Sequence, residues 1–165
     1  MQSTKVFVLD GGNTHIKLGT FVDHELIQTK RFQERAALDK HLSSDDIVVI
    51  ANVGERQLQQ DLIDIGCQVY TVSNMHPLPF ANAYNTPSTL GIDRLCNIVA
   101  VHQNHPNRNS LVIDAGTCIK FDFIDGLGTY HGGSISPGIS LRYQSLHEHT
   151  SQLPLLTPTT AWELL

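Results

Sequence analysis

The chain has 165 residues, of which 41% are hydrophobic and 16% are charged, enough for one ordinary domain or two small ones. Eleven Lys and Arg against sixteen Asp and Glu leave a net charge of −5, which argues against non-specific binding to nucleic acid or to an anionic membrane surface. The composition is that of a folded protein, and because no apolar run has the length of a secretory signal or a membrane span, we expect a cytoplasmic location.

The first part of the chain is expected to alternate strands and helices. Residues 5–10 form an apolar, β-rich run that ends in Asp10 and a Gly-Gly-Asn turn, so this run and residues 15–21 are predicted to pair as a hairpin. Apolar residues at helical spacing predict a helix over residues 55–65. The other predicted elements are strands over residues 25–32, 46–51 and 67–72 and a helix over residues 34–42. This order, βββαβαβ, is a mixed α/β layer.

The second part of the chain follows a connection rich in Pro and Asn over residues 74–90. Ser88 or Thr89 is expected to cap a helix that runs to about residue 103. A Pro-Gly pair is expected to open another helix over residues 137–150. Between these two helices the predicted strands cover residues 111–114, 118–124 and 130–135.

Cysteines and histidines give no sign of a metal centre. Cys67, Cys96 and Cys118 are odd in number and far apart, which fits neither a disulfide framework nor a zinc site. We therefore expect buried, reduced thiols. The nine histidines are expected to be solvated or capping residues. His102 and His105 stand beside Pro106 at a helix end, and His147 and His149 are two residues apart, so that on a helix they face different ways.

An internal repeat joins residues 8–17 (VLDGGNTHIK) and residues 112–120 (VIDAGTCIK). Each copy has a strand, an Asp, a Gly-containing turn and an Ile-Lys pair on the next strand. Glycine turns expose backbone N–H groups that bind phosphate oxygens, and an Asp at the strand end is positioned for a cation. Either turn alone is explained more simply as an ordinary hairpin turn. As a pair, the two turns favour a site that holds a polyphosphate and its metal.

Gly91, Ile92, Asp93 and Arg94 form a second cluster, in the first turn of the helix predicted after residue 88. A helix N-terminus favours an ionised carboxylate, which suits Asp93 to serve as a base or a metal ligand. Acidic residues are also common in first turns for structural reasons alone. This cluster by itself therefore decides nothing.

Four motifs in order make the sequence resemble the type III pantothenate kinases, members of the actin-like, sugar-kinase-like ATPase superfamily. The resemblance covers essentially the whole chain. It rests on residues 10–14 (DGGNT), residues 84–94 (Y-x-x-P-x-x-LGIDR), residues 113–117 (IDAGT) and residues 132–138 (GGSISPG). It implies an α/β chain with the ribonuclease-H-like, actin-like ATPase fold. In that fold two related βββαβαβ-type domains, here residues 1–80 and a partial domain over residues 81–165, flank a nucleotide cleft.

The resemblance implies ATP-dependent phosphorylation of pantothenate to 4'-phosphopantothenate, the first step of coenzyme A biosynthesis. It assigns Asp93 as the general base, Asp10 as a Mg²⁺ ligand and Asp114 as the ligand of a monovalent cation, K⁺ or NH₄⁺. Since phosphoryl transfer depends mostly on positioning and charge neutralisation, loss of Asp10 or Asp114 is expected to be as damaging as loss of Asp93. The resemblance assigns ATP binding to Asp10, Gly12, Asn13, Thr14, Lys17, Gly116 and Thr117, and pantothenate binding to Tyr84, Gly91, Ile92, Asp93 and Arg94.

The sequence departs from the family pattern at Gly11, Ile92 and Cys118, where an apolar residue, Ala and a small residue are more usual. The larger departure is length. The chain stops inside a helix expected near residue 159, so that the second sheet is expected to expose an edge and an apolar face. Either the chain is a fragment, or a partner covers that surface.

The family implies a homodimer, and two other functions stay open. One is a non-catalytic or truncated relative that acts as a nucleotide-binding or regulatory module. The other is a kinase of the same superfamily that acts on a sugar or a small acid. Tyr84 and Arg94, spaced as in the substrate motif, argue against this second alternative, since an Arg is a natural partner for a carboxylate substrate.

Overall fold

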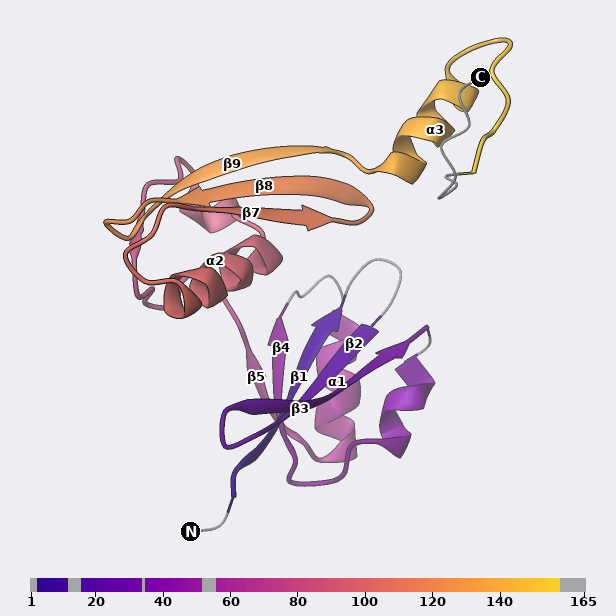
Figure 1. Cartoon of the computed structure of the whole chain (residues 1–165). Coiled ribbons are helices and arrows are strands. Elements are labelled where there is room, and N and C mark those ends of the chain that lie inside the picture. Colours follow the sequence, from indigo (N-terminus) through magenta and orange to yellow (C-terminus); the bar gives the residue numbers. More distant parts are fainter. Residues whose placement is uncertain (1–2, 12–15, 34, 52–55, 158–165) are drawn as a thin grey trace. The chain divides into compact units, whose positions relative to one another are not determined.

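A computed structural model describes residues 3–11, 16–33, 35–51 and 56–157 of the chain. Contacts group the chain into two compact units, which are described separately (Figure 1). The first unit comprises Met1–Pro77 and Ser88–Cys96, and the second comprises Leu78–Pro87 and Asn97–Leu165. The domain boundary expected between residues 80 and 81 stays a prediction.

The first unit is built on a five-stranded mixed sheet in the order β3-β2-β1-β4-β5, with the predicted sequence of elements. The strands β1, β2 and β3 form an antiparallel meander, while β1, β4 and β5 run parallel. The helix expected over residues 34–42 is a short 3₁₀ helix. The elements are β1 (Lys5–Gly11), β2 (Ile16–Val22), β3 (Glu25–Phe32), η1 (Arg35–Lys40), β4 (Ile47–Ala51), α1 (Arg56–Ile65) and β5 (Gln68–Thr71).

The core of this unit lies between the sheet and α1, which Figure 1 shows alongside the strands. Alternate residues of β1, β2 and β4 are buried, as expected of strands with one face toward a core. Leu58 and Leu62 of α1, one helical turn apart, bury the apolar face of the helix. Each fully buried aliphatic side chain contributes about 1.5–3 kcal/mol of transfer free energy. The buried cluster comprises Phe7, Leu9, Ile16, Leu18, Leu38, Leu42, Val48, Ile50, Leu58, Leu62 and Cys67.

The second unit contains a four-stranded sheet in the order β6-β9-β8-β7. The strands β7, β8 and β9 are antiparallel neighbours, whereas β6 pairs parallel with β9 over two residues and is too short to be seen as a strand in the sequence. The predicted strands and the final helix are confirmed with small changes at their ends. Its elements are β6 (Ala81–Asn82), β7 (Ser110–Ala115), β8 (Cys118–Ile124), β9 (Thr129–Pro137) and α3 (Ile139–Glu148). The turn η2 (Pro87–Thr89) and the helix α2 (Ile92–Asn104) are divided between the two units.

The start of α2 differs from the prediction that Ser88 or Thr89 caps it. The N–H of Leu95 donates to the carbonyl of Gly91 at 3.1 Å, which makes Gly91 the first residue to accept an intrahelical bond. Residues 87–89 form the separate 3₁₀ turn η2. The carbonyl of Ser88 accepts a hydrogen bond from the Asn74 side chain at 2.7 Å. Ser88 and Thr89 were therefore wrong as caps, because a Pro-led turn takes up these residues before the helix begins.

The sheet of the second unit exposes apolar side chains on β7, which lies at its edge in the described part of the chain. Leu111 and Ile113 of β7, whose side chains project from the same face of the sheet, are each more than half exposed. Ile135 of β9 is paired with Lys120 and is exposed on the opposite face. The exposed edge and apolar face expected from the sequence are therefore confirmed. In the described ranges, no helix combines the length and apolar composition needed to cross a membrane.

Tyr130 and Asp122 form a buried polar pair in this unit. The Tyr130 hydroxyl donates to Asp122 Oδ1 at 2.6 Å, with the two residues 0% and 2% exposed. The Phe80 ring meets Tyr130 edge-on with a centroid distance of 6.3 Å. A carboxylate this deeply buried is stable only when its oxygens accept hydrogen bonds.

We expect Tyr130→Phe to lower the free energy of unfolding by about 1.5–3 kcal/mol, because it removes a hydrogen bond to a buried carboxylate. Urea unfolding of the whole chain measures the difference. The matched control is Tyr70→Phe, since Tyr70 is 58% exposed and its hydroxyl loses little when removed. Equal losses in the two variants would contradict the assignment of the buried pair.

Candidate functional site

The two copies of the sequence repeat fold as two hairpins with the same pairing. Asp10 at the end of β1 lies opposite Lys17 of β2, and Asp114 near the end of β7 lies opposite Lys120 of β8. Lys17 Nζ lies 3.4 Å from Asp10 Oδ2, and Lys120 Nζ lies 2.7 Å from Asp114 Oδ2. The repeat predicted from the sequence is confirmed as a structural repeat. Lys120 had no role in the sequence assignment, although the Ile-Lys pair of the repeat was the signal that points to it.

Three assigned ATP-binding residues, Gly12, Asn13 and Thr14, lie outside the described residues. Their roles stay predictions. Asp10 and Lys17 lie on either side of that turn and have 40% and 58% exposed side chains. The ends of the first hairpin are therefore open to solvent within their own unit.

The second turn is closed by hydrogen bonds that join two of the sequence motifs. The Gly116 N–H donates to the Cys118 carbonyl at 2.9 Å, and the Gly138 N–H donates to the Thr117 carbonyl at 2.9 Å. A Cβ on Gly138 would collide with the Gly116 carbonyl oxygen, whereas a Cβ on Gly116 itself would meet no atom within 4 Å. The prediction that the turn exposes its N–H groups to phosphate is therefore wrong for Gly116, because the N–H of this residue donates inside the turn. Gly116 leaves open space beside the turn instead. Thr117 beside it is exposed.

Asp93 stands in the first turn of α2, two residues after Gly91. A Cβ on Gly91 would lie only 2.6 Å from Asp93 Oδ1, so the missing side chain leaves room for this carboxylate. The helix N-terminus favours negative charge at the position of Asp93. Ile92 is half-buried, and Arg94 is 4% exposed. The position of the Asp93 carboxylate at the start of α2 thus depends on Gly91, a residue of the same sequence motif.

Cys96 lies within reach of the charges of two assigned carboxylates of the first unit. Burial, the charge of Asp10 and the charge of Asp93, in that order, raise the pKa of the Cys96 thiol above its ordinary value. Both carboxylates must therefore lie near enough to the sulfur for their fields to act on it. The phosphate motif and the substrate motif therefore each place one carboxylate near this thiol.

We expect Asp93→Asn to accelerate alkylation of Cys96 by iodoacetamide severalfold near pH 8, and Asp10→Asn to act in the same direction. Removing a nearby negative charge lowers the pKa of the thiol and so raises the thiolate fraction, which is the reactive form. Peptide mass spectrometry follows each cysteine separately. Cys67 is the internal control, because burial and Asp46 raise the pKa of its thiol. Unchanged Cys96 rates in both variants would contradict this geometry.

Tyr84, the first residue of the substrate motif, contacts an aromatic ring and a glycine of the second unit. Its ring stacks on Tyr130 with a centroid distance of 6.2 Å and an interplanar angle of 16°. Gly132 has a φ of +88°, and a Cβ there would lie 2.9 Å from the Tyr84 ring. Only glycine combines this backbone conformation with so close an approach. The substrate motif and the glycine-rich motif over residues 132–138 are therefore packed together.

The assigned residues thus fall into two groups, each within one unit. Asp10, Lys17 and the cluster over residues 91–94 belong to the first unit. Tyr84, Asp114 and residues 116–117 belong to the second unit. Within the first unit the carboxylates of the first two motifs each lie near Cys96. Within the second unit Gly132 packs against Tyr84, and the Gly138 N–H donates to the Thr117 carbonyl.

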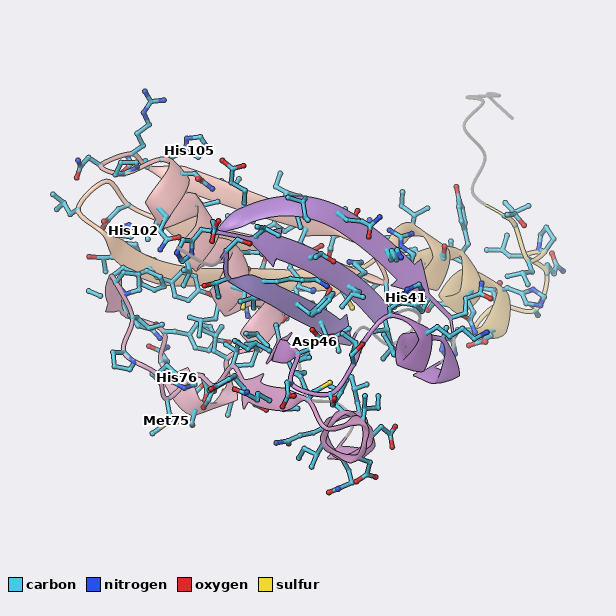
Figure 2. All side chains as sticks on the ribbon, turned by 90° about the horizontal axis from the view of Figure 1, so that it is seen from below. His41, Asp46, Met75, His76, His102 and His105 are labelled. Carbon is cyan, nitrogen blue, oxygen red and sulfur yellow. The ribbon has the colours of Figure 1, made fainter. Side chains whose placement is uncertain are left out.

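Several histidines in the described residues have local partners. His41 Nδ1 lies 3.2 Å from Lys30 Nζ, and His76 Nδ1 lies 3.0 Å from the backbone nitrogen of Ser73. Figure 2 labels both histidines and also His102, whose ring packs against Phe80. In the part of the chain that the structure describes, no group of three or more His, Cys, Asp or Glu is placed to hold a metal ion. All three cysteines are free thiols, but only Cys67 is buried, so the expectation of buried thiols is wrong for Cys96 and Cys118.

Comparison with known proteins identifies relatives over nearly the whole chain. A family model described as type III pantothenate kinase matches residues 6–163. Proteins named type III pantothenate kinase from Flavobacterium psychrophilum and Flavobacterium johnsoniae are 39% and 40% identical over 159 and 160 residues. Each alignment covers 92% of this chain but only 66% and 65% of the relative. The chain therefore spans about two thirds of the length of these relatives.

A solved structure supports the fold. A conserved protein from Campylobacter jejuni, described as belonging to the Baf family of transcriptional activators, superposes with a TM-score of 0.55 at 22% identity. The match covers 88% of this chain and 60% of that chain. At this identity the likeness concerns the fold alone.

Proposed function

Because the chain belongs to the type III pantothenate kinase family, with its actin-like ATPase fold, we propose that the protein transfers the γ-phosphoryl group of ATP to pantothenate. The product is 4'-phosphopantothenate, and the reaction is the first step of coenzyme A biosynthesis. The family match over residues 6–163, with Asp10, Asp93 and Asp114 all present, is the observation that carries this proposal. A cytoplasmic homodimer belongs to the same proposal.

Asp93 is the proposed general base. Its carboxylate, at the start of α2, accepts the proton of the substrate hydroxyl as that oxygen attacks the γ-phosphorus. Gly91 leaves room for the carboxylate, and the helix N-terminus favours its ionised form before the proton arrives. Tyr84, Ile92 and Arg94 keep the proposed role of pantothenate contacts, with the Arg94 guanidinium as the proposed partner of the substrate carboxylate.

Asp10 fits the demands of Mg²⁺ in a kinase, where one or two carboxylates act together with substrate phosphates. Its side chain is 40% exposed at the end of β1, and its ion pair with Lys17 is long at 3.4 Å. Bound Mg²⁺ supplies charge neutralisation for the phosphates. The proposed ATP contacts are Lys17 of β2, Gly12, Asn13 and Thr14 of the first repeat, and Gly116 and Thr117 of the second.

Asp114 does not fit a site for a free K⁺ or NH₄⁺ ion. Lys120 Nζ already lies 2.7 Å from Asp114 Oδ2, which is the distance of a charge-assisted hydrogen bond. No step of the proposed reaction is therefore routed through a free monovalent cation.

The test is pantothenate-dependent formation of ADP from ATP and Mg²⁺ by the purified chain, with the product identified by mass spectrometry. We expect ADP formation to require pantothenate, and a phosphate ester of pantothenate to accumulate in equal amount. Pantoate and glycerol serve as control acceptors, since each offers a hydroxyl without the complete substrate. ADP formation that does not depend on the acceptor would contradict the proposal. A folded chain that binds ATP without turnover would favour the nucleotide-binding module.

A further inference from the structure

The Asp–Lys pairs of the two repeats differ in a way that the sequence does not show. In the first hairpin the ammonium and the carboxylate are 3.4 Å apart, and both side chains are well exposed. In the second hairpin they are 2.7 Å apart, and the Lys120 side chain is only 21% exposed, although the Asp114 side chain, at 39%, is about as exposed as that of Asp10. The second pair is therefore short and its ammonium partly buried, while the first pair is long and its ammonium exposed.

Strand register holds the short pair in place. Asp114 and Lys120 are directly paired residues of β7 and β8, so their side chains project from the same face of the sheet. A partly buried ammonium is held to its carboxylate more strongly than an exposed one, because water and salt screen the pair less. An ammonium fixed in this way carries the same single positive charge as K⁺ or NH₄⁺.

We propose that the Lys120 ammonium is a built-in monovalent cation at Asp114, so that the kinase reaction of this chain needs no K⁺ or NH₄⁺. The catalytic part of this inference rests on the proposed function. Lys120 acts through Asp114 and the turn that follows it, and is a positioning residue. Asp114 in turn holds Lys120 in place. Loss of Asp114 is therefore still expected to damage the kinase reaction.

Cation dependence of turnover is the first test. Wild-type activity in choline chloride and in KCl should agree within about twofold. In choline chloride the Lys120→Met variant should be slower than the wild type by about tenfold or more, and it should regain activity in KCl or NH₄Cl. Methionine keeps most of the side-chain volume without the charge. Lys120→Arg, which keeps the charge, should stay independent of K⁺, and Lys40→Met is a control at an exposed lysine of η1.

Binding of Tl⁺, a K⁺ analogue, is the second test, and it does not depend on turnover. Titration calorimetry should detect no Tl⁺ site in the wild-type chain and one site in Lys120→Met. Strong activation of the wild type by K⁺, or Tl⁺ binding to it, would overturn the inference even if Lys120→Met failed to fold. If the chain has no kinase activity, the proposed function fails, and the Tl⁺ titration alone tests the inference. Binding of Tl⁺ by Lys120→Met but not by the wild type would support the built-in cation. Any other pattern of Tl⁺ binding would refute it.

Discussion

Gly138→Ala is expected to lower the free energy of unfolding by about 3 kcal/mol, because the added methyl group would overlap the carbonyl oxygen of Gly116. A second carbonyl, that of Thr117, lies 2.6 Å from the same Cβ position. Both contacts are backbone atoms, which cannot rotate away as a flexible side chain does. Gly138 has a φ of −69°, so alanine suits the backbone conformation there and the whole effect is steric.

Gly116→Ala is the matched control, since it makes the same chemical change in the same turn. A Cβ at Gly116 meets nothing within 4 Å, and the loss of glycine entropy in the unfolded chain is expected to leave stability unchanged or slightly higher. Urea unfolding of the two variants and the wild type measures the comparison. If Gly138→Ala were as stable as Gly116→Ala, the close packing of the two motifs would be disproved.

Asp93→Asn is expected to reduce pantothenate-dependent ADP formation by about 100-fold or more, because an amide does not accept the proton of the substrate hydroxyl. The loss should appear in kcat, with stability close to that of the wild type. Asp64→Asn is the control, since Asp64 is an exposed residue of α1 whose carboxylate accepts a hydrogen bond from Gln60 at 2.8 Å. Wild-type turnover by Asp93→Asn would exclude this residue as the base.

Gly91→Ala tests the placement of the same carboxylate without removing it. The new Cβ would lie 2.6 Å from Asp93 Oδ1, so the carboxylate must move, while the change at the start of α2 costs less than about 1 kcal/mol. We expect turnover to fall and the unfolding midpoint to change little. Full activity of this variant would mean that the position of the Asp93 carboxylate in the structure is not the one used in catalysis.

Most elements could be predicted because their signals are local. Alternating apolar residues and a Gly-containing turn define each hairpin over about ten residues, and the leucines of α1 mark its buried face. The start of α2 was misplaced, because Ser88 and Thr89 have the right chemistry for a cap but belong to the turn begun by Pro87. The strand β6 was missed because two residues carry no periodicity.

The sequence by itself determined which residues form the candidate site: its repeat and motifs single out Asp10, Asp93, Asp114 and the glycines between them. Strand register, also local, then sets each Asp opposite a Lys. Only the tertiary structure decided that Gly138 packs against the second turn and that Cys96 lies near two carboxylates. It also decided that one Asp–Lys pair is short and the other long. The physical reason is range: turn chemistry and periodicity act over a few residues, whereas packing, burial and charge depend on segments far apart in the chain.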